Sequence, residues 1–475
     1  MMTATRSLAL ALAALPAVLV AAGGAPGEES TSMPVRFMTL DPGHFHASLV
    51  QKEMYPGVVS PRVDVYAPVG TDLVEHLGRI TAFNMRKDAP TSWQLEIHTG
   101  PDFFERMLKE HPGNVVVFSG RNQGKIERIA ASVHAGLNVL ADKPWILKSQ
   151  DLPALEKALA EADAKGVVAY DIMTERFEVT SQLQRELVND KDVSGGIERG
   201  TSERPAVYME SIHHLMKVVA GAPNIRPAWF FDTAQQGEGM NDIGTHLVDL
   251  VQWTLFPEQA IDYKADIEVL SAQQWPTSIT EADFKKVTGG QSFPASVQAK
   301  VQNGALQYDC NTITSYTLRG VHVKLNVIWD WEAPAGAGDR HFAIYRGKTA
   351  AVEVRQTKAD GYRTELYVVP NPGADVVAVH GAVERRLASI ATTYPAVSSE
   401  LRGKEIHVVI PDKFRDGHEA HFARVTRNFL AYLQDSSTLP SWERPNMLAK
   451  YYVTTTGTEL SHQSAPRVGE RLAPQ

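Results

Sequence analysis

The stretch LNVLADKPW, residues 137–145, is a short apolar run that ends in an acid, a lysine and a proline. The residues before it, 130–136, are typical of a helix end stopped by glycine, so 137–140 is predicted to be a strand. In open α/β sheets, ligands bind beyond the carboxyl ends of the strands. Lys143 therefore stands where a side chain meets a ligand, and Pro144 restricts the backbone that carries it. The alternative is a solvated lysine in a strand-to-helix loop.

The residues around this stretch alternate between strand and helix patterns. Strands are predicted at 35–40, 63–67, 95–98, 114–118, 137–140 and 167–170, and helices at 103–110, 125–134 and 152–164. Alternating units of this kind form a mostly parallel, doubly wound sheet with helices on both faces. The sequence thus predicts an α/β protein whose first domain covers residues 33–172.

Beyond residue 172 the pattern changes. Helices are predicted at 174–188, 239–255 and 419–433, while strand patterns dominate from 265 to 354, including 296–301, 322–329 and 350–354. Runs of strands with few helices between them favour an antiparallel sheet. We therefore expect a second α/β domain at 173–465, built on an open, mostly antiparallel sheet.

The composition limits the classes of partner. The chain has 475 residues, enough for two domains, with 43% hydrophobic and 21% charged residues. Its formal net charge of −8 gives no support to a nucleic-acid or anionic-membrane partner. Cys310 is the only cysteine, which excludes an intramolecular disulfide and a thiolate metal cluster.

Residues 1–32 are typical of a secretory signal peptide followed by a polar spacer. Arg6 precedes an apolar run at 8–22 that ends in small residues and is interrupted by Pro16. The run is short for a bilayer span, so a membrane anchor is the weaker alternative. We expect cleavage near Ala22, export to the periplasm or the extracellular space, and no membrane insertion of the mature chain.

The first predicted strand ends in TLDPGHFHA, residues 39–47. A dinucleotide fold needs a tight glycine turn here, so that the backbone and a helix N-terminus can approach a pyrophosphate. Gly43 can serve as the central glycine, but Asp41 and His46 replace the glycines that flank it. The acid expected at the end of the second strand is not in its place, because Asp64 lies within that strand. The fourth strand ends in FSGRN, residues 118–122, which suits a ribose or nicotinamide edge.

A second motif, GEGMNDIGTHLVD at residues 237–249, opens with glycines and continues as a predicted helix that Asn241 or Asp242 can cap. Asp242 and His246 are four residues apart and so share one helix face. A carboxylate beside an imidazole tunes and orients it, which is how a general base near neutral pH is built. The alternative is a capping aspartate with a histidine satisfied by packing.

Two segments, Asp142-Lys143-Pro144 and Asp242-Ile243-Gly244-Thr245-His246, resemble the E-K-P and D-x-G-x-H motifs of the glucose–fructose oxidoreductase / inositol dehydrogenase (Gfo/Idh/MocA) family. The lead-in at 131–139 is similar too, and the resemblance covers most of the mature chain. It departs from the family in Asp142 for glutamate, the altered glycine turn and the missing second-strand acid. The chain resembles a secreted branch with a divergent C-terminal domain. The resemblance implies a Rossmann domain that binds NAD, with NADP as the alternative.

The resemblance also implies roles for individual residues. Lys143 would contact the nicotinamide ribose and a substrate hydroxyl, His246 would be the acid/base, and Asp242 would orient the substrate or the base. The expected cofactor contacts are Gly43, His44, Phe45, Ser119, Arg121, Asn122, Asp142 and Lys143. The expected substrate contacts are Arg176, His213, His214 and Trp229, against a packing or surface role for each.

The histidines also raise the question of zinc or iron, since His44, His46, His213 and His214 could join Asp242 and His246. Neighbours at i and i+1 point to different sides, however, and no H-E-x-x-H pattern exists. The sequence therefore predicts no metal site.

The family's substrates are mainly sugars, cyclitols and related polyols, so the predicted function is redox chemistry at a secondary alcohol of a sugar. Free nicotinamide cofactor is scarce outside the cytoplasm, which favours a tightly held cofactor that is reoxidised within one turnover. The first alternative is an NAD-dependent glycosidase that works by oxidation and elimination, and the second is a non-catalytic carbohydrate-binding protein. A carbohydrate is the expected partner, and a homo-oligomer through the C-terminal sheet is compatible with this organisation.

Overall fold

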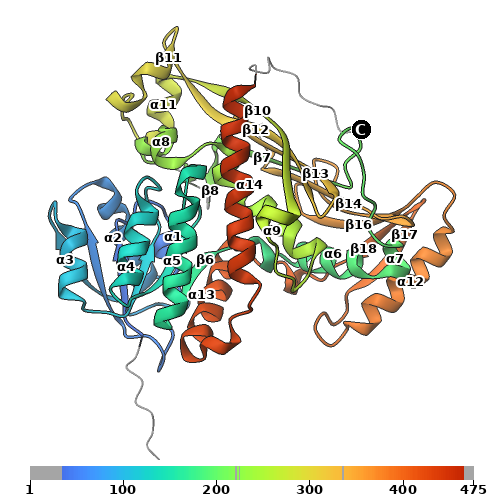
Figure 1. Ribbon diagram of the computed structural model, residues 1–475, viewed down its shortest axis with the longest axis horizontal. Helices are drawn as coiled ribbons and strands as arrows, with labels where there is room; N and C mark the ends of the chain where they lie inside the picture. The colour runs from blue at the N-terminus through green and yellow to red at the C-terminus, as the bar shows by residue number, and fades with distance from the viewer. Residues whose placement is uncertain (1–34, 220–221, 224, 334–335, 465–475) are drawn as a thin grey trace, which may run out of the picture. The chain divides into compact units, whose positions relative to one another are not determined.

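The computed structural model describes residues 35–219, 222–223, 225–333 and 336–464 (Figure 1). The predicted signal peptide and spacer, residues 1–32, lie outside these ranges. Within them, no helix combines the length and the apolar character needed to pass through a bilayer.

The first domain is a six-stranded parallel sheet in the order β3-β2-β1-β4-β5-β6. This order is that of dinucleotide-binding Rossmann folds, and it places a topological switch point between β1 and β4. The strands are β1 (Phe37–Leu40), β2 (Arg62–Ala67), β3 (Gln94–Thr99), β4 (Val115–Phe118), β5 (Asn138–Asp142) and β6 (Ala169–Ile172). The helices are α1 (His46–Leu49), α2 (Thr71–Met85), α3 (Phe103–Glu110), α4 (Lys125–His134) and α5 (Leu152–Lys165).

Strand β5 forms where the sequence predicts it. Gly136, at φ 79°, ends α4, and the next residues enter the sheet between β4 and β6. Val139, Leu140 and Ala141 are fully buried, so the apolar run is covered on both faces. The carboxyl end of β5 consequently delivers Asp142 and Lys143 to the edge where β1 and β4 also end.

The second domain is built on a ten-stranded mixed sheet in the order β10-β12-β13-β7-β14-β15-β16-β18-β17, with β11 paired to β12. Neighbours are antiparallel except β7 and β13, which are parallel. Its strands are β7 (Val207–Met216), β10 (Ile267–Thr280), β11 (Val301–Gln302), β12 (Ala305–Leu318), β13 (Val321–Glu332), β14 (Arg340–Arg346), β15 (Ala350–Gln356), β16 (Glu365–Pro370), β17 (Ser398–Arg402) and β18 (Glu405–Val409). Short β8 (Val218–Val219) and β9 (Ala222–Pro223) pair with each other.

The helices of this region are α6 (Val179–Asn189), α7 (Lys191–Ser194), α8 (Thr233–Gln236), α9 (Gly239–Leu255), α10 (Tyr263–Asp266), α11 (Glu281–Thr288), α12 (Val376–Ser389), α13 (His418–Gln434) and α14 (Glu443–Gln463). Helix α9 begins directly against β12, because a Cβ added at Gly239 would lie 2.1 Å from the carbonyl oxygen of Cys310. Glu238 and Asn241 form its N-terminal capping box. Asp242 therefore does not cap the helix, and its side chain points elsewhere.

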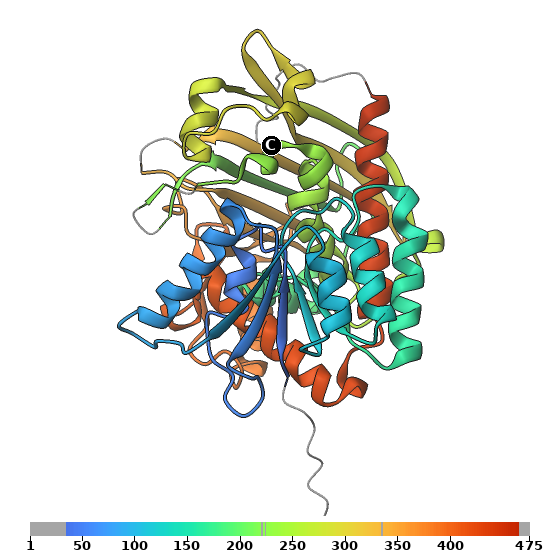
Figure 2. The same ribbon diagram turned by 90° about the vertical axis from the view of Figure 1, so that its left-hand side faces the viewer.

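The last two helices return to the parallel sheet. Helix α13 adds Phe422, Val425 and Phe429 to a core that contains Phe37 of β1. Helix α14 contacts α5 on one side and α9 and β10 on the other, and Figure 2 shows it beside α5. The backbone N–H of Ser149 donates to the carboxylate of Glu459 on α14 at 2.8 Å. The segment 418–463 thus contributes to the core of both domains.

The structure confirms the predicted α/β architecture of a parallel sheet followed by a mostly antiparallel one. The strand predicted at 296–301 is wrong in its main part. Ala295–Lys300 is a 3-10 turn, because Pro294 opens the segment and only Val297 turns its side chain into the core.

Candidate active site

Lys143 and Asp242 meet across the two domains. The ammonium of Lys143, just past β5, forms an ion pair with the carboxylate of Asp242 in the first turn of α9, and both are buried. Lys143 Nζ also lies 3.2 Å from the carbonyl oxygen of Asp242. Burial opposes ionisation of Asp242, but Lys143 outweighs it and holds the pKa of the carboxyl below its usual range. The pair is therefore charged on both sides.

His246 lies one turn further along α9. Its Nδ1 is buried and has no hydrogen-bond partner among the described residues. Burial, reinforced by the positive charge of Lys143, holds the pKa of His246 well below its usual range. The imidazole is thus neutral at neutral pH and carries a nitrogen without a fixed partner beside the Lys143–Asp242 pair.

Asp142 is bound by two imidazoles and a hydroxyl, a group we call the Asp142 cluster (His44, His46, Ser119 and Asp142). His44 Nδ1 and His46 Nδ1 lie 3.2 Å and 2.8 Å from Asp142 Oδ2, and Ser119 Oγ donates to the same oxygen at 3.0 Å. Burial opposes ionisation of Asp142, yet the two histidines hold its pKa well below the usual range. Through these contacts Asp142 anchors the turn after β1 to the end of β5.

Two groups at this edge are not selected by the sequence analysis: His418, the first residue of α13, and Glu175, in the 3-10 turn that follows β6. His418 Nε2 lies 3.2 Å from His46 Nε2, and His418 Nδ1 lies 3.8 Å from the carboxylate of Glu175. Burial and the neighbouring carboxylate of Glu178 raise the pKa of Glu175 to about 7, against the opposing charge of Lys143. Glu175 is therefore a carboxyl that exchanges its proton near neutral pH within the field of Lys143.

The turn after β1 keeps the shape of a glycine turn without its first glycine. Asp41 takes a left-handed φ of 44°, a conformation that glycine adopts without strain. A Cβ added at Gly43 would lie 2.9 Å from the indole of Trp229, whose Nε1 donates to Asp72 at 2.9 Å. Arg121 pairs with Asp41 and Asp72 and lies over the Trp229 ring. Side chains of both domains thus cover Gly43.

The other predicted contact residues lie in different surroundings. Arg176 is paired with Asp249 and Glu443 in an internal ion network, so its guanidinium serves packing between elements. His213 and His214 both contact Asp339, at 3.4 Å and 3.0 Å. Asn122 and Phe45 are the last two of the predicted contact residues.

Asn122 donates from its side-chain amide to the carbonyl of Gln236 at 2.7 Å, which ties β4 to the second domain. Phe45 stacks against His44 and His46, with ring centroids 4.6 Å and 4.4 Å away. Of the predicted set, the structure brings His44, Ser119, Asp142, Lys143, Asp242 and His246 to one edge. It gives Arg176, His214 and Asn122 partners that hold the fold.

Known proteins share this architecture. A family model described as "Putative oxidoreductase C terminal domain" matches residues 183–462, more than half of the chain. The chain belongs to this family. A crystal structure of a putative oxidoreductase from Parabacteroides merdae ATCC 43184 is 46% identical, with a TM-score of 0.88, and covers 90% of this chain and 98% of that one. The oxidoreductase fold is therefore common to both chains along most of their length.

Two more distant proteins match. The putative oxidoreductase YteT of Bacillus subtilis (strain 168) is 26% identical over 168 residues, which span 34% of this chain and 35% of that protein. The chain thus aligns with about a third of YteT. KijD10, a 3-ketoreductase from Actinomadura kijaniata solved with NADP and TDP-benzene, is 14% identical with a TM-score of 0.53, covering 91% of this chain and 98% of that one. At that identity the likeness shows the fold alone.

In this member of the oxidoreductase family, two parts of the carboxyl edge of the parallel sheet suit a dinucleotide differently: the ends of β4 and β5, and the turn after β1. At the β4 and β5 ends, Ser119 and Lys143 offer a hydroxyl and an ammonium of the kind that hold a ribose. At the β1 turn, the N–H of His44 donates to the Ser119 carbonyl at 3.0 Å, and α1 has only four residues. A pyrophosphate would fit beside Gly43 only after Trp229 leaves it. The nicotinamide end fits the residues present, and the pyrophosphate end requires this displacement.

Several residues at this edge are not found from the sequence. Asp72 follows the second strand but sits in the first turn of α2, where Asp72 faces the Gly43 turn instead of a strand end. The sequence does offer one cue to Asp72, because this acid stands two residues after Gly70. Glu175 and His418 carry no local signal, because the contact between them forms only when α13 packs beside the turn after β6.

Proposed function

We propose that this protein is a nicotinamide-dependent oxidoreductase of the Gfo/Idh/MocA type that acts on a secondary alcohol of a sugar or sugar derivative. The observation that carries the proposal is the Lys143–Asp242 pair, formed across the two domains at the carboxyl edge of the parallel sheet. A neutral imidazole with an unpartnered nitrogen, His246, lies beside it. The relative solved with NADP is a ketoreductase of the same fold, which adds support for the cofactor class.

Each residue has a definable task in such a reaction. The nicotinamide accepts or returns the hydride when bound. Loss of hydride from a carbinol carbon requires removal of the hydroxyl proton, and His246 accepts that proton because it is neutral. Lys143 hydrogen-bonds the same oxygen and stabilises its developing negative charge. Asp242 holds the side chain of Lys143 in position through its carboxylate and its backbone carbonyl, so Lys143 needs no reorganisation.

The cofactor would be held by Lys143 and Ser119 at its nicotinamide end. Native mass spectrometry of the purified mature protein tests this directly. A bound mass equal to NAD(H) or NADP(H), or its uptake on addition of either dinucleotide, is the expected result. A chain that carries no dinucleotide and takes up neither at millimolar concentration would contradict the proposal.

A second candidate, an oxidative-elimination glycosidase, is favoured by Glu175. After oxidation of a sugar hydroxyl to a ketone, the adjacent C–H loses its proton and the glycosidic oxygen leaves as the protonated alcohol. Water then adds to the resulting unsaturated ketone, and the cofactor returns its hydride to the carbonyl. This sequence needs a second proton acceptor, and the pKa of Glu175, raised to about 7 by burial and by Glu178, suits that role. Release of nitrophenol from p-nitrophenyl glycosides without net cofactor reduction would identify this activity. Net reduction of cofactor by free sugar would identify the dehydrogenase.

A non-catalytic carbohydrate-binding role is the least supported alternative. Its support is the covered Gly43 turn, which leaves the pyrophosphate end closed. A binding protein, however, has no need of a charged Lys143–Asp242 pair beside an unpartnered imidazole. Sugar binding with no dinucleotide uptake would favour it.

We further propose that the protein is exported and that its mature chain begins near residue 23. N-terminal sequencing of the mature protein from the periplasm or the culture medium is expected to start within a few residues of Ala22. Recovery of soluble protein that still carries residues 8–20 would contradict a cleaved signal. Light scattering of the same sample would test the proposed homo-oligomer through the C-terminal sheet.

A further inference from the structure

The Asp142 cluster has the spacing of a metal-binding triad. His44 Nδ1 and His46 Nδ1 lie 3.2 Å and 2.8 Å from one oxygen of Asp142, and the three ligand atoms lie within 4.8 Å of one another. First-row divalent ions bind such atoms at about 2.0–2.2 Å, which places adjacent ligands about 3.0–3.4 Å apart. The two separations differ from that spacing by roughly half an ångström at most. A small rotation of either ring would therefore admit an ion.

The groups behind the triad are those that orient metal ligands in proteins. A ligating histidine usually donates its other ring N–H to a neighbour, and a ligating carboxylate is itself hydrogen-bonded. His46 Nε2 faces His418 Nε2 at 3.2 Å, Ser119 Oγ donates to the Asp142 carboxylate at 3.0 Å, and Lys125 Nζ donates to the Asp142 carbonyl at 3.0 Å. The rings and the carboxylate are thus held from both sides.

The local charge favours a cation. The side chain of Asp142 contacts two imidazoles and a hydroxyl, with no arginine or lysine among these contacts, and the neighbouring ammonium of Lys143 is paired with Asp242. A second histidine–carboxylate group in the structure, Asp64, Glu96 and His98, has the opposite character. Arg36 pairs with Asp64 and Arg62 pairs with Glu96, so guanidinium charge already occupies the place of a cation.

We propose that His44, His46 and Asp142 bind one divalent transition-metal ion, of the class of Zn²⁺, Mn²⁺ or Fe²⁺, beside the Lys143–Asp242 pair. Three protein ligands leave at least one coordination position open. His44 interacts electrostatically with both Lys143 and Asp242, so an ion at the triad would lie next to the proposed catalytic pair, and its open position would be available to the proposed sugar oxygen. There the ion polarises that oxygen as a Lewis acid. The role toward sugar rests on the proposed function, whereas binding of the ion does not.

Cobalt binding tests the site without cofactor or sugar. The full mature chain is stripped with a chelator and titrated with Co²⁺, followed by visible absorption and calorimetry. One ion per chain is expected, and His44→Gln, His46→Gln and Asp142→Asn should each weaken binding by more than the ten- to hundredfold typical of losing an orienting neighbour. His418→Gln should fall within that ten- to hundredfold range.

His98→Gln is the matched control, because it removes a histidine from the arginine-paired group and should leave Co²⁺ affinity unchanged. Folding of every variant is checked by circular dichroism. Failure of the intact chain to bind Co²⁺, or undiminished binding by His44→Gln and His46→Gln, would overturn the proposal.

Azide tests the open coordination position. Added to the Co²⁺ form, it is expected to shift the visible bands, since an exchangeable position accepts a small anion. Unchanged bands would mean a closed ion site and would overturn the Lewis-acid role. Dinucleotide uptake in native mass spectrometry together with no Co²⁺ binding would defeat the metal proposal and leave the proposed function standing. Co²⁺ binding without dinucleotide uptake would defeat the proposed function and leave the metal site standing.

Discussion

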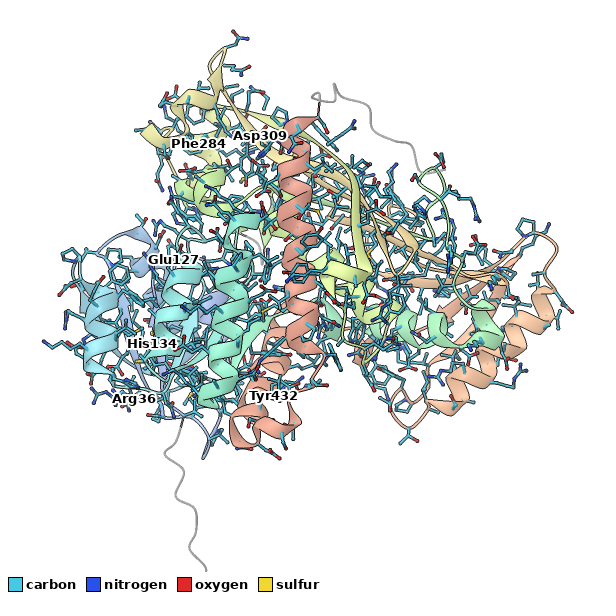
Figure 3. All side chains as sticks on the ribbon, viewed as in Figure 1. Arg36, Glu127, His134, Phe284, Asp309 and Tyr432 are labelled. Atoms are coloured by element: carbon cyan, nitrogen blue, oxygen red, sulfur yellow. The ribbon has the colours of Figure 1, made fainter. Side chains whose placement is uncertain are left out.

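Two buried carboxylates in the parallel sheet, Asp64 and Asp142, each accept from histidine, yet their surroundings differ. Asp64 in β2 accepts from Arg36 Nε and lies 3.0 Å from His98 Nε2, whereas Asp142 in β5 contacts only imidazoles and a hydroxyl through its side chain among the described residues. Figure 3 labels Arg36 near the end of the domain opposite Glu127, which lies in the first turn of α4. Asp64 lies inside β2, opposite Met38 of β1, whereas Asp142 is the last residue of β5.

The difference lies in the partner that balances the charge. Guanidinium stays charged at every physiological pH, so Asp64 is neutralised permanently. Imidazole changes its protonation and can exchange a proton for a metal or a ligand. A carboxylate beside histidine is thus part of a permanent ion pair in β2 and part of the proposed active site at the end of β5.

The largest expected effect is a difference in turnover between variants near Asp142 and variants near Asp64. His246→Gln should lower turnover by about a hundred- to ten-thousand-fold, the usual contribution of a positioned acid/base, and leave cofactor affinity nearly unchanged. Lys143→Ala should damage both, because Lys143 lies at the β5 edge that meets the ribose. Steady-state kinetics with cofactor titration measure the split. His98→Gln, which alters the partner of Asp64, should retain full turnover. Equal loss of cofactor binding in the first two variants would show the roles to be misassigned.

The next effect concerns the free energy of unfolding, which should depend on the ion pair of Asp64. Asp64→Ala leaves Arg36 without its buried partner and should lower the free energy of unfolding by about 3 kcal/mol, as loss of one member of a buried pair does. Turnover per folded molecule should not change. Urea denaturation and active-site titration measure the two quantities. A fall in turnover per folded molecule would place Asp64 in the proposed active site.

A smaller effect depends on pH. The pKa of Glu175 is raised to about 7 in the folded chain by burial and by Glu178, so the unfolded carboxyl releases its proton at lower pH than the folded one. Stability contributed by this group is therefore lost as pH rises from about 4.3 to 7. Glu175→Gln removes this dependence of stability on pH. Because 38% of the side chain is accessible, solvent screening limits the difference to roughly 1 kcal/mol. Urea unfolding midpoints of the unchanged protein and of Glu175→Gln, measured at pH 5 and pH 8, should reveal this difference. The same pH dependence in both proteins would contradict the raised pKa of Glu175.

The smallest effect concerns the covered turn. Trp229→Ala removes the indole from Gly43 and its hydrogen bond to Asp72, so a dinucleotide no longer has to displace them. Its affinity for NADH should rise about fivefold, equivalent to the ~1 kcal/mol of one hydrogen bond. Fluorescence titration measures the affinity, with Trp253→Ala as a control distant from Gly43 in sequence. Weaker binding in Trp229→Ala would mean that the indole holds the cofactor.

Much of the first domain can be predicted from the sequence, because each of its strands is a short apolar run between helix patterns. Helix α2 is not predicted, since Val74 and Met85 are exposed and blur its apolar face. The 3-10 turn at 295–300 has strand-like residues but follows a proline. Long-range packing, with no local pattern, also brings α13 back to the parallel sheet.

The candidate site divides in the same way. Lys143, Asp242 and His246 can be selected because their motifs lie at a strand end and on one helix face. The contact between His44 and Asp142 joins residues 98 positions apart, and no pattern in either segment specifies it. The expectation that histidines at i and i+1 point to different sides does not keep His213 and His214 from a common partner, since both contact Asp339.

Helix α14 has a consequence for the lifetime of a bound cofactor. Lys450 on α14 pairs with Asp171 at the end of β6 at 2.7 Å and with Asp249 of α9 at 3.6 Å, all three buried. Swinging the domains apart would strip these charges of their partners, at a cost of several kcal/mol. Exchange of a dinucleotide is then left to the loop that carries Trp229. If the protein binds a dinucleotide as proposed, we expect a slow off-rate, so that one cofactor molecule would serve many catalytic cycles before it is replaced.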